Sequence, residues 1–299
     1  MMTTTTNIEY VKKKGAFAGF LTVLLAMISR SSGLLGLTLV AFHIVLAIVS
    51  PAITPHDFKD VNAQIILNAP SYEHLFGTDS LGRDVLTRTM LGGRQALLVT
   101  TIATILAITW GGFLGVLLGL VGGRLDEFLM RIVDAFLCLP WILVLLLIVV
   151  MVGSDPGVLI ATLGFFYGIP VIRVARAATH DVVAQDFVTA ARARGESRST
   201  IVWRELAPNV LDVLLVEGAM RWSWMLLAFS SLSFLGFGIS PPTPDWGMMI
   251  SNSLSIMSLA PWTALAPVVA LSSLIIGINL SADALAKAVG IDRAQKAPI

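Results

Sequence analysis

Six long apolar stretches constrain this chain more than any other feature of its sequence. They cover residues 33–50, 96–121, 132–152, 157–172, 210–236 and 262–280. A helix needs about 20 residues, each rising about 1.5 Å, to cross the ~30 Å hydrocarbon core of a bilayer. Five of the stretches come close to that length, and 157–172 reaches it with residues past Arg173. The sequence therefore predicts an all-α integral membrane protein with six transmembrane helices.

The overall composition supports a membrane protein. Apolar residues make up 56% of the chain and charged residues 13%, whereas a soluble domain carries about 25% charged residues. Because no long basic run interleaves with aromatic residues, the sequence gives no support for nucleic-acid binding. Cys138 is the single cysteine and lies in an apolar run. This excludes disulfide scaffolds and cysteine metal sites, and we expect Cys138 to be a small buried residue.

The distribution of Lys and Arg predicts the orientation of the chain in the membrane. With a cytoplasmic N-terminus and six alternating spans, fifteen basic residues fall on the cytoplasmic side and four on the opposite side. The fifteen are Lys12, Lys13, Lys14, Arg30, Arg124, Arg131, Arg173, Arg176, Arg192, Arg194, Arg198, Arg204, Lys287, Arg293 and Lys296, and the four are Lys59, Arg83, Arg88 and Arg94. Because cytoplasmic loops carry the excess of basic residues, both termini are predicted to face the cytoplasm.

The remaining segments complete the predicted organisation. The apolar stretch 16–28 has 13 residues, which is too short to span, and no small-residue cleavage site follows it. We expect a helix near the cytoplasmic interface within a cytoplasmic segment 1–32. Residues 33–95 hold the first span and a long outer loop, 96–285 a core of five spans, and 286–299 a cytoplasmic tail.

The largest predicted cytoplasmic loop, about 173–209, contains DFVTAARARGESRSTIVWRELAPNV from residue 186 to 210. Ala-rich sequence favours a short helix over about 187–194, and Gly195 can end it in a left-handed conformation. A second helix can start at Ser197 or Ser199 as N-cap and reach Leu206, and Pro208 ends it. We therefore predict a cytoplasmic helix–turn–helix with small residues on one side and Arg and Glu on the other. Such a surface suits docking, although a merely solvated loop is the alternative.

Ala190–Ala191, Gly195 and Pro208 resemble the EAA loop of binding-protein-dependent ABC importer permeases. In that family the loop, here 186–208, forms coupling helices that dock on the ATPase subunit. Thr189 departs from the family's Glu, and Ala207 stands where Leu is common. The resemblance assigns ATPase coupling to Asp186, Ala190, Ala191, Arg194, Gly195, Glu196, Arg204 and Pro208.

Four further segments occur in the same order as in permeases of the dipeptide, oligopeptide and nickel class. They are EHLFGTDSLGRDVLTR (73–88), GGRLDEFLMRIVDAFLCLP (122–140), SFLGFGISPPTPDWGMM (233–249) and NLSADAL (279–285). The pattern is most similar to the second permease of such systems. The resemblance implies a type I ABC importer fold, a homologous permease partner, two ABC ATPase subunits and an extracytoplasmic substrate-binding protein. Di- or oligopeptides are the expected substrate, and nickel, nickel chelates or opines are alternatives.

The sequence contains no ATP-binding motif of its own. A Walker loop needs Gly-Lys, and this dipeptide is absent from the chain. Gly111, Gly112, Gly115 and Gly119 lie inside a predicted span, where small residues let helices approach closely. We therefore expect no cofactor on this chain, with ATP and Mg²⁺ bound by the partner ATPase subunits.

Charged residues within the predicted spans are candidates for the substrate path. Asp212, Glu217 and Arg221 enter the fifth span, and Glu217 and Arg221 are four residues apart, so they can pair on one helix face. A neutralised pair at a subunit interface and a polar path lining both remain open. Asn279 is a further path candidate.

The histidines and the outer GRD motif are expected to have structural roles. His43, His56, His74 and His180 lack metal-ligand spacing, and His43 is expected to be hydrogen-bonded within the bundle. Arg83 and Asp84 are expected to organise the outer loop.

Two other classes of protein are less favoured by the sequence. An intramembrane enzyme is disfavoured because HExxH and GxSxG are absent, and an ATP-independent carrier because no internal repeat is visible.

Overall fold

The structure is a computed structural model that describes residues 16–290, and it is built from helices. The long helices are α2 (Ser31–Ile53), α3 (Val85–Val121), α6 (Pro156–Val183), α9 (Ala207–Phe234) and α11 (Trp262–Val289). The shorter ones are α1 (Ala16–Ile28), α4 (Gly123–Leu137), α5 (Trp141–Val152), α7 (Asp186–Ala193), α8 (Arg198–Thr200) and α10 (Trp246–Ser253), with a π-helical turn at Ile201–Leu206 and 3-10 turns at Ala63–Ile65 and Leu254–Ile256.

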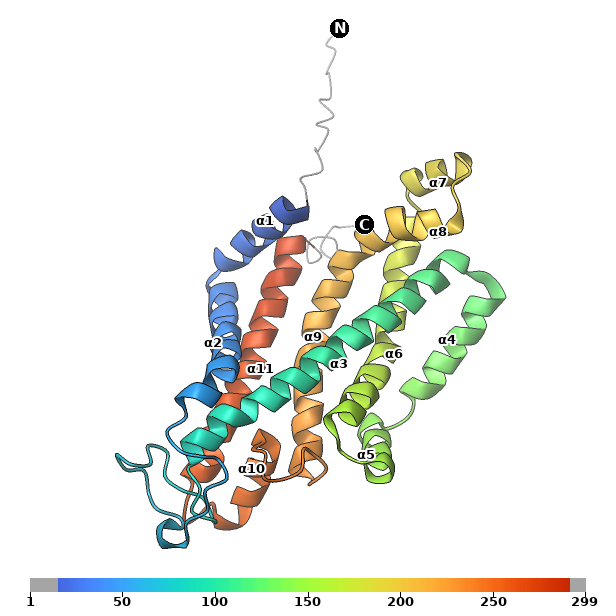
Figure 1. The fold of residues 1–299 in the computed structure, drawn as a ribbon. Helices are drawn as coiled ribbons and strands as arrows, with labels where there is room; N and C mark the ends of the chain where they lie inside the picture. Colours follow the sequence, from blue (N-terminus) through green and yellow to red (C-terminus); the bar gives the residue numbers. More distant parts are fainter. Residues whose placement is uncertain (1–15, 291–299) are drawn as a thin grey trace.

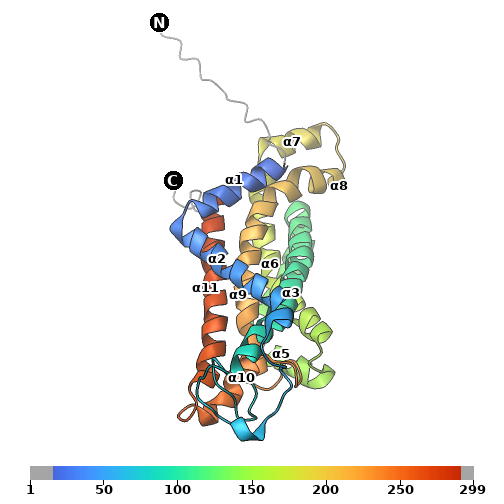
Figure 2. The ribbon, with the colours of Figure 1, turned by 60° about the vertical axis from the view of Figure 1, so that its left-hand side comes forward.

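The helices form a bundle with two distinct ends (Figures 1 and 2). At one end lie α7, α8, the end of α11 and α1, which is a separate helix lying across that end. At the other end lie α10 and the loop between α2 and α3. Lys12, Lys13, Lys14, Arg293 and Lys296, used in the predicted orientation, lie outside the described residues.

The bundle has the helices that a membrane protein needs. By length and composition, α2, α3, α6 and α11 can each cross a membrane, and the bent pair α4–α5 can make a fifth crossing. The fourth predicted span is thus extended past Arg173, as expected. Helix α9 has 28 residues but carries Asp212, Glu217 and Arg221 and is not among these four. The all-α membrane fold is confirmed, whereas the count of six spans stays a prediction.

The predicted span over 132–152 is broken in the structure. Helix α4 ends at Leu137, and α5 begins at Trp141 after a bend of 80°. Pro140 lacks a backbone N–H and disfavours helical geometry at Leu139, which favours a break at this point. Cys138 sits in the break and is exposed, which corrects the expectation of a buried cysteine.

Two predicted boundaries also change. Helix α3 begins at Val85, so the outer loop ends well before residue 95. The Asp84 carboxylate caps α3 by accepting a 2.7 Å hydrogen bond from the Thr87 N–H, which stabilises this earlier start. At the other end of the chain, α11 runs to Val289, so residues 286–289 of the predicted tail are helical. Gly290 then ends the helix in the left-handed conformation, with φ of 87°.

Three glycines of α3, Gly111, Gly115 and Gly119, lie against α6, and the predicted close approach of helices is confirmed. A Cβ added at Gly111 would stand 2.3 Å from the carbonyl oxygen of Gly168, and one at Gly115 would stand 2.5 Å from the Cβ of Ala175. The missing side chains therefore let the two backbones approach closely. Gly119 meets Thr179 in the same way, which makes α3 and α6 the tightest pair in the bundle.

Residues 239–261, which link the apolar stretches 210–236 and 262–280, fold back into the bundle through α10. Trp246 is 1% exposed, and its indole N–H donates a 2.8 Å hydrogen bond to the carbonyl of Thr89. Its ring lies against Gly92 and Gly93. His43 of α2 hydrogen-bonds to Ser273 of α11 at 2.9 Å, so the expected bond within the bundle is confirmed.

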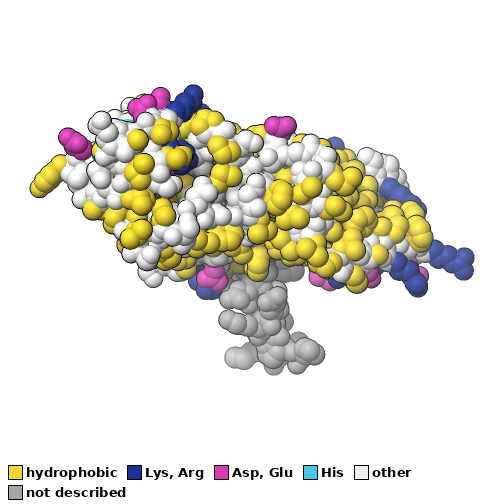
Figure 3. Space-filling view, turned by 90° about the horizontal axis from the view of Figure 1, so that it is seen from below, with side chains coloured by type: hydrophobic (Ala, Val, Ile, Leu, Met, Phe, Trp, Pro, Cys, Tyr) yellow, Lys and Arg dark blue, Asp and Glu magenta, His cyan; other side chains and the backbone are white. Residues whose placement is uncertain are grey.

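Seen from the end that carries the outer loop, apolar side chains spread along much of the surface (Figure 3). Lys and Arg gather toward the edge where α4, α7 and α8 lie in Figure 1. This distribution suits helices whose sides face lipid or another apolar surface and whose ends are charged.

Candidate coupling segment and central pocket

The predicted helix–turn–helix is present and projects from one end of the bundle (Figure 1). Helix α7 starts at Asp186 and ends at Ala193, within one residue of the expected helix. Gly195 has φ of 77°, and the Glu196 N–H donates to the carbonyl of Ala191 at 3.2 Å. A glycine adopts this left-handed conformation at little cost, so Gly195 permits the tight reversal.

The second arm differs from its prediction. Ser197 is the N-cap and accepts a 3.2 Å hydrogen bond from the Thr200 N–H. The chain then passes through the π-helical turn Ile201–Leu206 directly into α9, and Pro208 sits in the first turn of α9 instead of ending a helix. Proline has no N–H to give to the helical hydrogen-bond ladder, and the π-helical turn lies directly before it. The helix–turn–helix of residues 186–208, called the candidate coupling segment, is therefore continuous with α9.

The small residues of the segment do not all face outward. Val188 and Ala191 are fully buried and pack in one cluster with Ile201, Val202 and Leu206. Ala191 therefore packs the two arms together, whereas Ala190 is exposed.

The exposed face of the segment carries large side chains that the sequence reasoning missed. Phe187 is 40% exposed and Trp203 is 63% exposed, and Arg204, the residue after Trp203, is exposed as well. The Trp203 ring stacks on Phe113 of α3, with ring centroids 6.0 Å apart. Arg194 pairs with Glu196 at 2.7 Å across the turn. The sequence signal for this face was the presence of two aromatic residues in a short polar segment, because a solvated loop gains nothing from exposed aromatic side chains.

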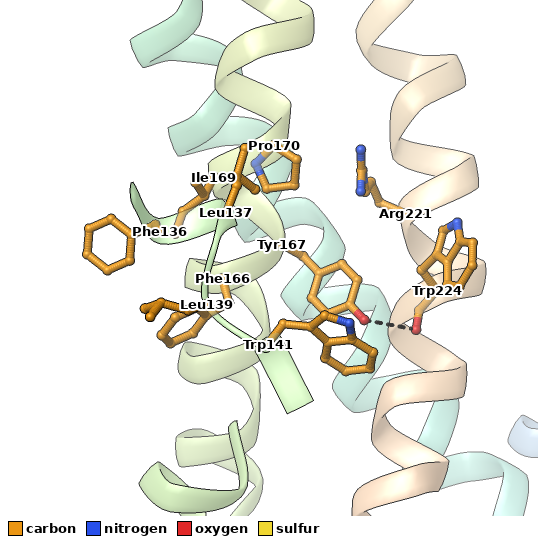
Figure 4. Close-up of a pocket in the computed structure, with 10 residues that line it drawn as sticks. All are labelled: Phe136, Leu137, Leu139, Trp141, Phe166, Tyr167, Ile169, Pro170, Arg221 and Trp224. Carbon is orange, nitrogen blue, oxygen red and sulfur yellow. Dashed lines mark hydrogen bonds between the residues drawn. The ribbon is translucent and has the colours of Figure 1, made fainter. Parts of the chain in front are cut away.

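A pocket of about 240 Å³ opens between α5, α6 and α9 (Figure 4). It is lined by Phe136, Leu137, Leu139, Trp141, Phe166, Tyr167, Ile169, Pro170, Arg221 and Trp224. The Tyr167 hydroxyl donates a 3.3 Å hydrogen bond to the carbonyl of Trp224, and Trp141 meets the Tyr167 ring edge-on at 5.9 Å. The lining is therefore aromatic and apolar with one cation.

Glu217 and Arg221 pair at 2.6 Å on α9, as their spacing predicts. Of the two, Arg221 lines the pocket. Asn279 and Asp212 are exposed and do not line it, so the structure does not bring the four candidate residues together. The aromatic lining was missed because its residues come from four helices, α4, α5, α6 and α9, spread over 89 positions of the sequence.

Two ion pairs join α4 to α6. Arg176 binds Asp126 through two hydrogen bonds of 2.5 Å, and Arg173 binds Asp134. Both arginines, which the sequence marks only as topology signals, thus also hold α4 against α6.

The outer loop is ordered by its GRD motif, as expected. Arg83 pairs with Asp79 at 2.7 Å, and Asp84 accepts from Nδ1 of His74 at 2.9 Å. His56 lies beside His74, although the sequence suggested scattered histidines. Asp245, the N-cap of α10, is 2% exposed, and burial raises its pKa to about 6.

A helical bundle with membrane-spanning helices, a projecting helix–turn–helix and a central pocket defines a membrane transport subunit. Residues 111–291 match the family model described as binding-protein-dependent transport system inner membrane component. The chain belongs to this family. It is thus a permease subunit of a binding-protein-dependent transport system, and the resemblance noted from the sequence is confirmed.

Curated relatives cover most of the chain. It is 33% identical to the dipeptide transport system permease protein DppC of Alkalihalophilus pseudofirmus, over 86% of this chain and 84% of the relative. It is 31% identical to the oligopeptide transport system permease protein OppC of Haemophilus influenzae, over 85% of this chain and 82% of the relative. The dipeptide permease DppC of Bacillus subtilis is 32% identical, over 85% and 80% of the two chains.

Proposed function

We propose that this chain forms the path for di- or oligopeptides in an ATP-driven importer, together with a homologous permease. The observation that carries this proposal is a pocket with aromatic walls and one cation, in a chain whose relatives are named as dipeptide and oligopeptide permeases. Aromatic faces accept side chains of many shapes, and a guanidinium can bind a peptide's terminal carboxylate. Such a lining suits varied peptides, and Glu217 keeps the free pocket near neutral.

The nickel alternative is less favoured. The named relatives transport peptides, and none of the pocket's lining residues is a His, Cys, Asp or Glu. Nickel prefers imidazole and thiolate ligands, so a bare ion would find no ligand in this lining.

The coupling segment supports an external motor. Phe187 and Trp203 expose apolar area at the end of the bundle that also carries α1. Arg192, Arg194, Arg198 and Arg204 are exposed in the same segment. We propose that this end is cytoplasmic and that an ABC ATPase subunit covers these aromatics. A second ATPase would bind the partner permease, ATP and Mg²⁺ would bind those subunits, and an extracytoplasmic binding protein would deliver substrate to the opposite end.

The proposed path and the coupling segment share α9. The π-helical turn that contains Trp203 runs without a break into the helix that carries Arg221. A displacement of the coupling segment by ATP binding would therefore move one wall of the pocket. This is the physical basis proposed for alternating access.

Uptake into proteoliposomes tests the proposed function. The chain is reconstituted with its partner permease and ATPase subunits, and the binding protein is added outside with ATP inside. ATP-dependent accumulation of labelled di- or oligopeptides is expected, with no accumulation of Ni²⁺ under the same conditions. Accumulation of peptide without ATP, or of Ni²⁺ alone, would overturn the proposal.

A further inference from the structure

Three side chains from separate parts of the outer loop meet at one place. His56 follows the end of α2, His74 lies in the middle of the loop, and Asp84 is the N-cap of α3. Each offers a nitrogen or oxygen atom within 4.8 Å of those of the other two. The two imidazole rings lie 4.6 Å apart at an angle of 33°. Folding of the loop therefore creates a cluster of potential ligands that spacing in the sequence does not reveal.

The hydrogen bonds of the two histidines define which nitrogens are free. Nε2 of His56 is 3.0 Å from the carbonyl oxygen of Glu73, which can only accept, so Nε2 carries the proton. Nδ1 of a neutral His56 therefore keeps its lone pair. In the same way, Nδ1 of His74 donates to Oδ1 of Asp84, which leaves the lone pair on Nε2.

The second oxygen of Asp84 is also committed. It accepts the Thr87 N–H at 2.7 Å, and the residue is 4% exposed. A carboxylate that accepts at both oxygens is fixed in orientation, and it in turn fixes the ring of His74. Histidines that bind metals nearly always donate their other N–H to a carboxylate or a backbone carbonyl, and both rings here have such a partner.

We propose that His56 and His74 bind one divalent transition-metal ion of the zinc class at the outer end of the protein. The free nitrogens Nδ1 of His56 and Nε2 of His74 are the ligands, Asp84 and the Glu73 carbonyl orient the rings, and water completes the coordination. Neutral imidazole is a preferred ligand of Zn²⁺.

The bound ion would join two helix ends that the sequence separates by a long loop. His56 lies three residues after the end of α2, and His74 is tied through Asp84 to the start of α3. The loop between them lies at the end where the binding protein is proposed to dock. Metal binding would therefore restrict the motion of this loop, whatever substrate the transporter carries.

Metal binding by the full-length chain tests this proposal. The chain is purified in detergent with a tag free of histidine, stripped with chelator and titrated with Zn²⁺ by calorimetry, with bound metal counted by mass spectrometry. One Zn²⁺ per chain is expected, with a rise in Tm on binding. His56→Gln and His74→Gln should each weaken binding at least tenfold. Asp84→Asn, which keeps an accepting oxygen for the cap, should weaken it about tenfold.

His180→Gln is the matched control, because His180 is exposed on α6 at the opposite end of the bundle. It should leave Zn²⁺ binding unchanged. The Tm of every variant without metal shows whether it has folded. If the wild-type chain binds no stoichiometric Zn²⁺, or if folded His56→Gln and His74→Gln bind it as tightly as the wild type does, the cluster is a hydrogen-bonded structural pair and the proposal is wrong.

Discussion

Arg176 of α6 donates two hydrogen bonds of 2.5 Å to the carboxylate of Asp126 on α4, one from Nε and one from Nη2. Asp126 is 3% exposed, whereas Leu125, Phe128 and Ile132 on the same helix are widely exposed. Helix α4 thus turns much of its apolar surface away from its own bundle. The bidentate pair is a main fixed point that holds this helix in place.

Replacing Asp126 with Asn should therefore destabilise the chain. Removing one partner of a fully buried ion pair costs about 3–5 kcal/mol. Since the Arg176 side chain is 30% exposed and can reach water, we expect a loss of about 2 kcal/mol. Denaturant unfolding in detergent measures the change. Asp283→Asn, at the exposed pair with Lys287, should cost below about 1 kcal/mol, and equal losses in both variants would contradict this account.

The close approach of α3 and α6 leads to a second prediction. Gly111→Ala places a methyl group 2.3 Å from the carbonyl of Gly168, so the helices must separate, at a cost of about 1–3 kcal/mol. A fall in Tm of several degrees is expected in a thermal-shift assay. Gly157→Ala introduces the same methyl group at the start of α6, where nothing lies within 4 Å, and should leave Tm unchanged or slightly higher. A harmless Gly111→Ala would show that the helices do not touch there.

Asp245 predicts a specific pH dependence. Burial raises its pKa in the folded chain to about 6, above the ~3.8 of the unfolded chain, so the folded state binds the proton more tightly. Its contribution to stability is complete below pH ~4 and is lost as pH rises through about 6, by about 3 kcal/mol in total.

Asp245→Asn should remove this component, because the amide oxygen can still accept from the Met248 N–H at 3.2 Å and nothing titrates. The free energy of unfolding of both proteins is measured between pH 4 and pH 8. The Asp245→Asn variant is expected to become more stable than the wild type, by a margin that grows as pH rises. A difference between the two proteins that is constant across this range would refute the assignment to Asp245.

The exposed Trp203 predicts a surface needed for assembly. Trp203→Ala should reduce copurification of the ATPase subunit at least tenfold, since a buried aromatic at the centre of an interface contributes about 2 kcal/mol or more. The isolated chain should keep its Tm within a few degrees. Leu259→Ala is the control, because Leu259 is 71% exposed near α10 at the other end. If both variants retain the ATPase equally, the coupling segment lies elsewhere.

Much of the fold follows from the sequence because apolar periodicity and helix-ending residues act locally. The reversal at Gly195, the pairing of Glu217 with Arg221 and the packing of Gly111 were all predictable, since each depends on residues within a few positions or on one property of glycine. The break at Pro140 was equally local. It was missed because hydropathy alone is continuous across the break.

The features that could not be predicted depend on contacts between distant segments. The pocket joins Trp141, Tyr167 and Arg221 from three helices, and the outer loop brings His56 to His74 across 18 positions. No local pattern marks such meetings. The inward turn of Ala191 was missed for the same reason, because the cluster that buries it includes residues of the following π-helical turn.

Helix α3 runs for 37 residues, or about 55 Å, which is far longer than the ~30 Å apolar layer of a bilayer. Its first turn is anchored by Asp84 beside the outer loop, and Phe113 near its far end stacks on Trp203. In the proposed assembly, α3 therefore contacts both the loop at which the binding protein would dock and the segment that the ATPase subunit would cover. A tilt of α3 would displace both ends together, so this one helix would couple substrate delivery to ATP hydrolysis.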